Sequence, residues 1–271
     1  MERRILGTSG IEVPVVGMGT WKTFDVRGPA DIERRRQVVD VALETDINLF
    51  DSSPMYGAAE QVLGAALDGR REKALVATKI WTANDRESEE QIRRSLGFYG
   101  GRIDVYQVHN LVEVDKRLRR LAELQRDGCV RAVGATHYAH NAFGELLSVM
   151  RSGRVSCVQV PYNVEDRLVE ERILPEAAAR NIGVIIMRPL GVGALARQAP
   201  SAAQLARFAE FGVRTWAQVL LKWLLSDPRV TTVIPATSNP EHARDNAVAG
   251  DPPWFAEAER KAVVQLAAEL A

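Results

Sequence analysis

Eight short apolar runs alternate along this chain with longer segments of helical periodicity, and this alternation limits the possible folds more than any other feature. Most of the runs are apolar at nearly every position, as expected for parallel strands that are covered on both faces. Between them, apolar side chains recur at i, i+3, i+4 and i+7, for example at Phe143, Leu146, Leu147 and Met150, which indicates amphipathic helices. The expected strands are Val15–Met18, Ile47–Phe50, Ala74–Thr78, Ile103–Val108, Val130–Ala135, Cys157–Val160, Val184–Met187 and Thr232–Ile234.

Strands and helices in this order, joined by right-handed crossovers, predict an α/β fold of the (β/α)8 TIM-barrel type. A barrel typically takes about 250 residues, so residues 1–271 are expected to form a single domain. Ahead of the first barrel strand, residues 4–13 are expected to form a β-hairpin that turns at Ser9-Gly10. A small extra helix is expected at Ala202–Phe211, and the chain is expected to end in a helix.

An open doubly wound sheet is the competing topology. Such a sheet carries a G-x-G-x-x-G fingerprint after its first strand, and the sequence GMGTWKTF has no third glycine there. A weaker G-x-G-x-x-A match, at Gly191, Gly193 and Ala196, follows the seventh strand. In a barrel, the loops after strands 7 and 8 commonly bind phosphate, so this match fits the barrel better.

The composition argues against several classes of partner. The 35 basic and 35 acidic residues cancel, which gives no electrostatic reason to expect nucleic acid or a membrane surface as the main partner. The N-terminal sequence MERRILGTSG lacks the apolar core of a signal peptide, so a cytoplasmic enzyme is expected. Cys129 and Cys157 have no metal-ligand spacing, and we expect free thiols and no metal site.

Four residues with proton-transfer chemistry lie at or near the ends of successive strands. Asp51 follows the second strand, Lys79 the third and His109 the fourth, while Tyr56 lies in the loop beyond Asp51. Because the carboxyl ends of barrel strands converge on one face, we expect these side chains to meet. The alternative is a buried structural Asp–Lys pair beside two ordinary polar residues, but four such residues at consecutive strand ends favour a catalytic site.

The four side chains suit the protonation of a carbonyl group. A tyrosine in water loses its proton only near pH 10, and a neighbouring ammonium is expected to lower that pKa by roughly 1–3 pH units. Lys79 would supply this ammonium, with Asp51 as its counter-charge, and His109 would hydrogen-bond a substrate oxygen. Gln159 and the pair Thr136-His137 end the sixth and fifth strands and suit a flat ligand that bears an amide.

The chain resembles the aldo-keto reductase superfamily over nearly its whole length. The segments that carry the resemblance are RRILGTSGIEVPVVGMGTW, FDSSPMYG, TKI, DVYQVHN, VGATHY, VQVPYN, MRPLGVG and VIPATSNPEHARDN. The resemblance implies a barrel closed at its base by the hairpin, a bound nicotinamide dinucleotide, and reversible reduction of aldehydes or ketones to alcohols. It implies Tyr56 as general acid, assisted by Lys79, Asp51 and His109.

The resemblance also assigns the cofactor-binding positions. They are Gly19, Thr20, Asp51, Thr136, His137, Gln159, Met187, Arg188, Pro189, Leu190, Gly191, Gly193, Ala236, Thr237, Ser238, His242, Asp245 and Asn246. His137 replaces the usual asparagine, and Met187 replaces the aromatic residue that often stacks on the nicotinamide.

Cofactor choice is where the chain departs most from the family. Ala236 and His242 stand where many members carry basic residues that hold the 2′-phosphate, although Arg188 or Arg244 could substitute. NADPH is therefore the expected cofactor, and NADH remains open.

Aromatic and apolar residues at the strand ends predict a substrate cleft for hydrophobic or aromatic carbonyls. The expected substrate-binding residues are Trp21, Met55, Trp81 and Asn110, with Phe24 and Trp254 as further candidates for the wall. Two other functions stay open at this stage. One is a cofactor-binding regulatory subunit that senses redox state with little turnover. The other is a barrel lyase that uses Lys79 as a Schiff-base nucleophile, which requires a neutral amine.

Overall fold

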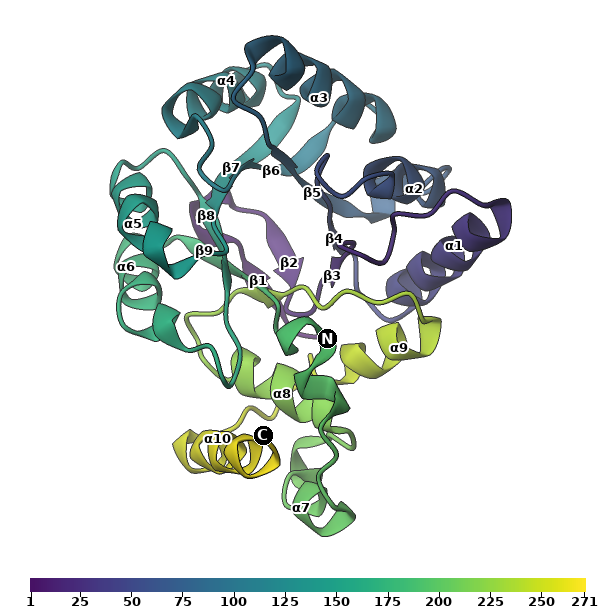
Figure 1. Ribbon diagram of the computed structural model, residues 1–271, viewed down its shortest axis with the longest axis vertical. Helices are drawn as coiled ribbons and strands as arrows, with labels where there is room; N and C mark the ends of the chain where they lie inside the picture. Colours follow the sequence, from purple (N-terminus) through teal and green to yellow (C-terminus); the bar gives the residue numbers. More distant parts are fainter.

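The computed structural model describes residues 1–271, and it shows a ring of eight parallel strands surrounded by helices (Figure 1). The strands follow one another around the ring in chain order, from β3 to β10. β3 and β10 close it, because the Gly17 N–H donates to the Val233 carbonyl at 2.8 Å and the Gly19 N–H to that of Pro235 at 3.1 Å. The predicted (β/α)8 barrel is therefore confirmed. The strands are Met18–Gly19 (β3), Leu49–Asp51 (β4), Leu75–Ile80 (β5), Ile103–His109 (β6), Val130–Thr136 (β7), Cys157–Pro161 (β8), Gly183–Met187 (β9) and Thr232–Val233 (β10).

The helices cover the outside of this ring (Figure 1). The expected extra helix is present as α7 followed by a short 3-10 turn over Ala209–Phe211, and the expected C-terminal helix is α10. The α-helices are Pro29–Glu44 (α1), Ala59–Ala66 (α2), Asp85–Phe98 (α3), Val114–Arg126 (α4), Phe143–Arg151 (α5), Ile173–Arg180 (α6), Ala202–Ala206 (α7), Trp216–Leu225 (α8), Pro240–Val248 (α9) and Glu257–Leu270 (α10).

Several strands extend one or two residues beyond their expected carboxyl ends. β4 includes Asp51, β5 continues through Lys79 to Ile80, and β6 includes His109. The sequence marks the end of a strand where the apolar run stops. The backbone ladder continues because the polar side chains at these positions are buried within the barrel and still allow the strand hydrogen bonds.

The N-terminal hairpin closes the amino end of the barrel, as the fold prediction requires. β1 (Arg3–Ile5) and β2 (Glu12–Pro14) pair antiparallel, and Leu6, Ile11 and Val13 are buried against the interior of the ring. Each strand from β4 to β9 contributes to this inner cluster, together with Ile234 just after β10. Its barrel members are Leu49, Ala77, Val105, Ala132, Cys157, Ile185 and Ile234.

A glycine lets the hairpin come this close to the strands. Gly7 has a φ of 55°, and a Cβ atom built on it would lie 2.2 Å from the Ser156 carbonyl oxygen. No side chain fits at that distance, and the left-handed conformation itself favours glycine. Gly7 therefore meets both a conformational and a packing requirement of the hairpin.

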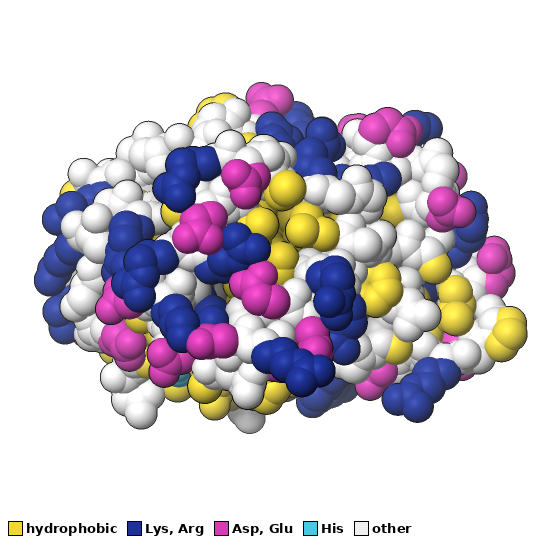
Figure 2. Space-filling view, turned by 90° about the horizontal axis from the view of Figure 1, so that it is seen from above, with side chains coloured by type: hydrophobic (Ala, Val, Ile, Leu, Met, Phe, Trp, Pro, Cys, Tyr) yellow, Lys and Arg dark blue, Asp and Glu magenta, His cyan; other side chains and the backbone are white.

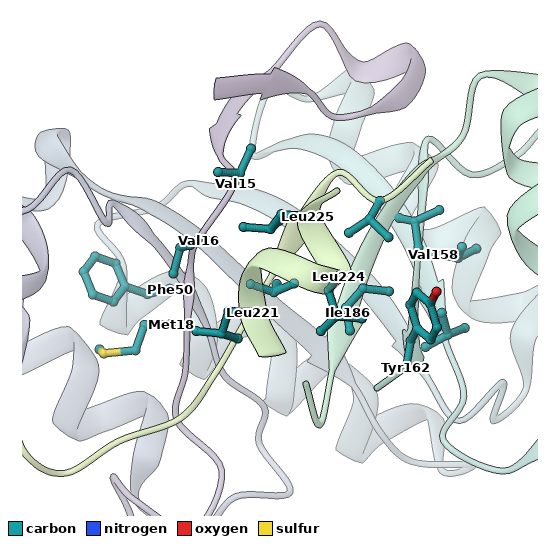
Figure 3. Packing of buried hydrophobic residues seen from close by; sticks show 14 of the residues in the cluster. Val15, Val16, Met18, Phe50, Val158, Tyr162, Ile186, Leu221, Leu224 and Leu225 are labelled. Carbon is teal, nitrogen blue, oxygen red and sulfur yellow. The ribbon is translucent and has the colours of Figure 1, made fainter. Parts of the chain in front are cut away.

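A larger apolar cluster fills the layer between the strands and the helices. Figure 3 shows part of it, with Leu224 of α8 beside Ile186 of β9, and with Leu221 of the same helix on the side of Met18 and Phe50. The helical stripe expected at Phe143, Leu146, Leu147 and Met150 is buried in the same layer.

The exterior carries interspersed charges. Figure 2 shows one face on which basic and acidic side chains alternate without a large field of one sign. Ion pairs such as Arg120–Glu89, at 2.9 Å, connect the neighbouring helices α3 and α4. No helix is both long enough and apolar enough to cross a lipid bilayer.

We predict that Leu6→Ala lowers the free energy of unfolding by about 2–5 kcal/mol, because it leaves a cavity in the apolar cluster between the hairpin and the strands. For a chain of this size, this corresponds to a fall of roughly 5–15 °C in melting temperature, measured by thermal unfolding. Ile5 is 54% exposed and Leu6 is fully buried, so Ile5→Ala is the matched control and should change stability by less than about 0.5 kcal/mol. Equal losses for the two variants would contradict the assigned role of Leu6.

Candidate active site

Parallel pairing brings the polar strand ends to one edge of the barrel. Asp51 lies opposite Ala77, Lys79 opposite Gln107, and His109 opposite Thr136 in the sheet register. Since every strand in the ring runs in the same direction, these positions share the carboxyl-terminal face. The sequence expectation that Asp51, Lys79 and His109 meet agrees with this arrangement.

Asp51 and Lys79 form a buried ion pair at the centre of this face. The Lys79 ammonium donates to both carboxylate oxygens of Asp51, at 2.7 and 2.8 Å, and to the Ser52 carbonyl at 2.7 Å. The side-chain amides of Gln107 and Gln159 add longer hydrogen bonds to Asp51, each 3.3 Å. Burial is the largest single influence and would lower the pKa of Lys79, but the Asp51 carboxylate, together with Tyr56 and Glu60, outweighs burial, so the pKa is raised. Lys79 therefore stays a cation although water cannot reach it.

Tyr56 lies half-buried in the loop after β4 and faces both partners. The Lys79 Nζ atom is 5.3 Å from the centre of its ring, and the His109 ring stands edge-on at 5.9 Å between centroids. The net effect on the phenol differs from the sequence expectation. Burial raises the pKa of Tyr56 above its ordinary value, because the loss of water outweighs the opposing charge of Lys79. The phenol therefore carries its proton at neutral pH.

His109 is neutral because it is buried, and the side chain of a serine contacts its ring. Burial is the main cause that lowers the pKa of His109 to about 2, and the Lys79 charge adds to it. The Nδ1 atom lies 3.0 Å from the hydroxyl oxygen of Ser53, and that oxygen also accepts a hydrogen bond from the Met55 N–H at 3.3 Å. The hydroxyl can donate its own proton to Nδ1, since a serine hydroxyl both donates and accepts. In that tautomer the Nε2 atom carries the ring proton and can donate it toward a substrate oxygen.

Ser53 is a candidate site residue that the sequence did not reveal. It stands inside the FDSSPMYG segment, beside Asp51, and its side chain is buried. Serine is common in loops, so nothing in the sequence separates Ser53 from its neighbour Ser52. Only the fold shows that Ser53 contacts the histidine, whereas the Ser52 hydroxyl accepts from Thr20 at 2.9 Å.

A cavity of about 550 Å³ opens at this face, a size typical of small-molecule sites. Many of the expected ligand-binding residues line it. They are Gly19, Thr20, Trp21, Asp51, Met55, Tyr56, His109, Asn110, Gln159, Met187, Arg188, Pro189, Leu190, Gly193 and Ala236.

The other expected residues lie outside the cavity lining. They are Lys79, Trp81, Thr136, His137, Gly191, Thr237, Ser238, His242, Asp245 and Asn246. Lys79 is buried beside the cavity, bonded to Asp51 and 5.3 Å from the centre of the Tyr56 ring. Asp245 instead bonds the N-terminus of α8, where Thr215 and Gln218 donate to its carboxylate at 2.9 and 2.6 Å.

Three aromatic residues expected at the substrate wall lie elsewhere. Trp81 is 40% exposed and its side chain is not part of the cavity. Phe24 is fully buried in the outer apolar cluster. Trp254 donates to the Glu2 carboxylate at 3.0 Å, beside the hairpin at the opposite end of the barrel. Position after a strand end alone did not show which way these rings point.

Unpartnered polar atoms at the cavity fit an amide-bearing ligand. The Asn110 Oδ1, Thr136 Oγ1 and Gln159 Oε1 atoms are buried and form no hydrogen bond, although buried polar atoms are normally paired. Asn110 and Gln159 line the cavity directly, so their oxygens can accept from a carboxamide N–H2. These residues therefore fit the nicotinamide ring that the sequence predicts.

The loop between β10 and α9 is built without a free cation. Asn239 caps α9 by accepting from the Glu241 N–H at 3.0 Å, and Thr237 accepts from the Asn239 N–H at 3.1 Å. His242 is exposed, and Arg244 lies 3.5 Å from the carboxylate of Glu44. The helix N-terminus therefore offers backbone N–H groups rather than a guanidinium to a phosphate. Elsewhere in the chain, no cluster of His, Cys, Asp or Glu side chains has a metal-binding arrangement.

A barrel supports many chemistries, so the class of this protein rests on comparison with known proteins. The chain belongs to the aldo/keto reductase family, whose sequence model matches residues 15–266. It is therefore an oxidoreductase by family.

Three curated relatives of this chain come from bacteria. Methylglyoxal reductase YeaE of Escherichia coli is 27% identical over 91% of this chain and 89% of its own length. The NADH-specific methylglyoxal reductase of Escherichia coli is 30% identical over 72% of this chain and 69% of its own length. Aldo-keto reductase YhdN of Bacillus subtilis is 29% identical over 72% of this chain, and the match spans 64% of that relative.

The fold is similar to solved structures over almost its full length. An aldo/keto reductase from Klebsiella pneumoniae, solved in complex with NADP and acetate, superimposes with a TM-score of 0.84. The two chains are 22% identical, and the match covers 98% of this chain and 95% of the other. This likeness establishes the barrel architecture and its hairpin.

Proposed function

We propose that this protein reduces aldehydes or ketones to alcohols with a nicotinamide cofactor, and that residues 1–271 act as one domain. The observation that carries the proposal is the buried Lys79–Asp51 pair next to a protonated Tyr56 and a neutral His109. Membership of the aldo/keto reductase family supports it.

In this proposal each side chain has a distinct role. His109 donates from Nε2 to the substrate carbonyl oxygen and fixes its position. Tyr56 gives its proton to that oxygen as negative charge develops there, and Lys79 stabilises the phenolate that remains. Asp51 keeps Lys79 charged and in place. The nicotinamide, when bound against Gln159 and Met187, supplies the hydride.

Cofactor choice follows from the loop after β10. We propose that NADPH is used and that NADH is also accepted, because Ala236 and His242 provide no lysine or arginine to bind the 2′-phosphate, and Arg244 lies 3.5 Å from the Glu44 carboxylate. Relatives differ in the same respect, since one is NADH-specific and a structural neighbour was solved with NADP. Apolar lining residues such as Trp21, Met55 and Leu190 suit a substrate with a hydrophobic or aromatic body.

The direct test follows the nicotinamide absorbance with a panel of aromatic and aliphatic aldehydes, using NADPH and NADH in parallel. We expect turnover with both cofactors and Michaelis constants that differ by less than about tenfold, the effect of one charge-assisted hydrogen bond. Tight cofactor binding without turnover on any carbonyl would instead favour a redox-sensing regulatory subunit. Borohydride trapping on Lys79 would favour a Schiff-base lyase, which its paired, protonated state argues against.

We predict that Ser53→Ala lowers kcat by about 5–10-fold, because His109 loses the hydrogen bond that fixes its tautomer. The Michaelis constant for cofactor should change by less than about twofold, since Ser53 lies behind the histidine. Ser52→Ala removes the neighbouring hydroxyl, which has no contact with His109, and serves as control. If both variants lost the same activity, a general packing defect would explain the result.

A further inference from the structure

Two cations line the cavity, the exposed Lys22 and the half-buried Arg188, and neither has a role in the proton transfer described so far. Arg188 follows β9 directly, and its half-buried side chain lines the cavity. No carboxylate of the chain pairs with its guanidinium. Asp51, the only acidic residue in the cavity lining, is held by two hydrogen bonds from Lys79. The charge of Arg188 is therefore available to an anion that comes from outside the chain.

Two aromatic rings hold the guanidinium over the cavity. Its central carbon lies 5.8 Å from the centre of the Trp21 ring and 5.1 Å from that of Tyr138. Trp21 follows β3 and Tyr138 follows β7, so these rings come from loops two strands away on either side of β9. Stacking on aromatic faces leaves the N–H groups of a guanidinium free at its edge, where a carboxylate binds with two parallel hydrogen bonds.

The backbone at Arg188 is held in a conformation that arginine rarely adopts. Its φ is 54°, in the left-handed region. The Asn163 side chain fixes this turn by donating to the Arg188 carbonyl at 3.2 Å, while its own oxygen accepts from the N–H groups of Glu165 and Asp166. Residues in such conformations are concentrated at binding sites, because the surrounding structure must hold them there.

Arg188 also shares the cavity with the proposed acid. Its charge is among those that oppose the upward shift of the Tyr56 pKa, so the guanidinium and the phenol act on the same space. The apolar side chains of Trp21 and Met187 also line the cavity. The cavity thus combines a proton donor, apolar walls and a fixed cation.

We propose that Arg188 binds a carboxylate of the substrate, so that the preferred substrates are aldehydo or keto acids with an apolar body between the two groups. This inference rests on the proposed reductase function and narrows its substrate class. The competing source of the anion is a phosphate of the cofactor, which shares the same chemistry. The experiment therefore measures the affinity for substrate and the affinity for cofactor separately.

The kinetic test compares two aldehydes that differ only in charge, 4-carboxybenzaldehyde and its methyl ester, methyl 4-formylbenzoate. The wild type should prefer the acid. Arg188→Met should raise the Michaelis constant for the acid by about 10–100-fold, the effect of losing a charge-assisted pair, and change that for the ester by less than about threefold. Arg188→Lys keeps the charge without the planar fork and should recover part of the preference.

Lys22→Met is the matched comparison. Lys22 also lies over the Trp21 ring, at 4.5 Å, and has no carboxylate partner, but its side chain is exposed. Its loss should affect the acid by less than about threefold, because an exposed charge is screened by water. If Lys22→Met and Arg188→Met weakened the acid equally, general attraction of anions would explain the preference and the proposal would fail.

Two binding measurements separate the outcomes. The dissociation constant of NADPH, from quenching of tryptophan fluorescence, should differ by less than about threefold between wild type and Arg188→Met. A large loss there, with equal effects on acid and ester, would assign Arg188 to a cofactor phosphate and overturn the proposal. Calorimetric binding of the product, 4-(hydroxymethyl)benzoate, should weaken about 10–100-fold in Arg188→Met. This readout decides the role of Arg188 even if no aldehyde is turned over and the proposed function fails.

Discussion

Tyr56→Phe is expected to lower kcat/KM for carbonyl reduction by about 10²–10⁴-fold, because it removes the proton donor and leaves the rest of the cavity unchanged. The phenyl ring keeps its edge-on packing with His109, whose ring centre is 5.9 Å away. Steady-state kinetics with a good aldehyde measures the loss. Cofactor affinity, measured by fluorescence titration, should stay within about twofold of the wild type.

Tyr106→Phe is the control for this substitution. Tyr106 is fully buried in β6, its hydroxyl has no hydrogen-bond partner, and it does not line the cavity. The same chemical change there should leave the rate within about twofold of the wild type. A Tyr56→Phe enzyme with the wild-type rate would remove Tyr56 as the acid, whatever the family resemblance.

Lys79→Met should be the most destabilising single change at the site. It leaves the Asp51 carboxylate buried without its counter-charge, which costs about 3–5 kcal/mol. For a chain of this length the melting temperature should fall by roughly 10 °C, as measured by thermal unfolding. Activity should also fall steeply, because the phenolate formed at Tyr56 loses its neighbouring cation.

The double variant Asp51→Asn with Lys79→Met separates stability from catalysis. Neutralising both partners removes the uncompensated charge, so most of the lost stability should return. Activity should not return, since no ammonium remains near the Tyr56 ring. If the double variant were as unstable as Lys79→Met, burial of an unpaired carboxylate would not be the cause of the instability.

The barrel could be predicted because its strands are easy to recognise in the sequence. Covered on both faces, they appear in the sequence as continuous apolar runs such as Val130–Ala135, and the helices between them keep a clear period. The strand ends were less accurate. At Asp51, Lys79 and His109 the chain places polar side chains on a strand that still makes its ladder, and hydrophobicity alone cannot show that continuation.

The site was predictable as far as it depends on strand order. Asp51, Lys79 and His109 meet because neighbouring parallel strands must end on the same face. The contribution of Ser53 was not predictable, since it depends on one hydroxyl lying 3.0 Å from Nδ1 of His109. The orientations of the Trp81 and Trp254 side chains could not be predicted either, because they depend on loop geometry.

The pKa of Tyr56 shows a second limit of prediction from the sequence. The sequence indicates the charged neighbour that lowers its pKa, but not how completely the fold removes water from the phenol. Burial turned out to be the larger effect. A phenol with a raised pKa in the free enzyme is compatible with catalysis, because the proton leaves only once negative charge appears on the substrate oxygen.

The packing of the hairpin against the barrel has a consequence for folding during synthesis. Leu6, Ile11 and Val13 pack against residues from Leu49 to Ile234, and the Glu2 N–H bonds the carbonyl of Gly250. The residues of the hairpin thus reach their place only after residues as late as Gly250 have been made. Until then they stay outside the nascent ring, so docking of the hairpin is expected among the last events of maturation.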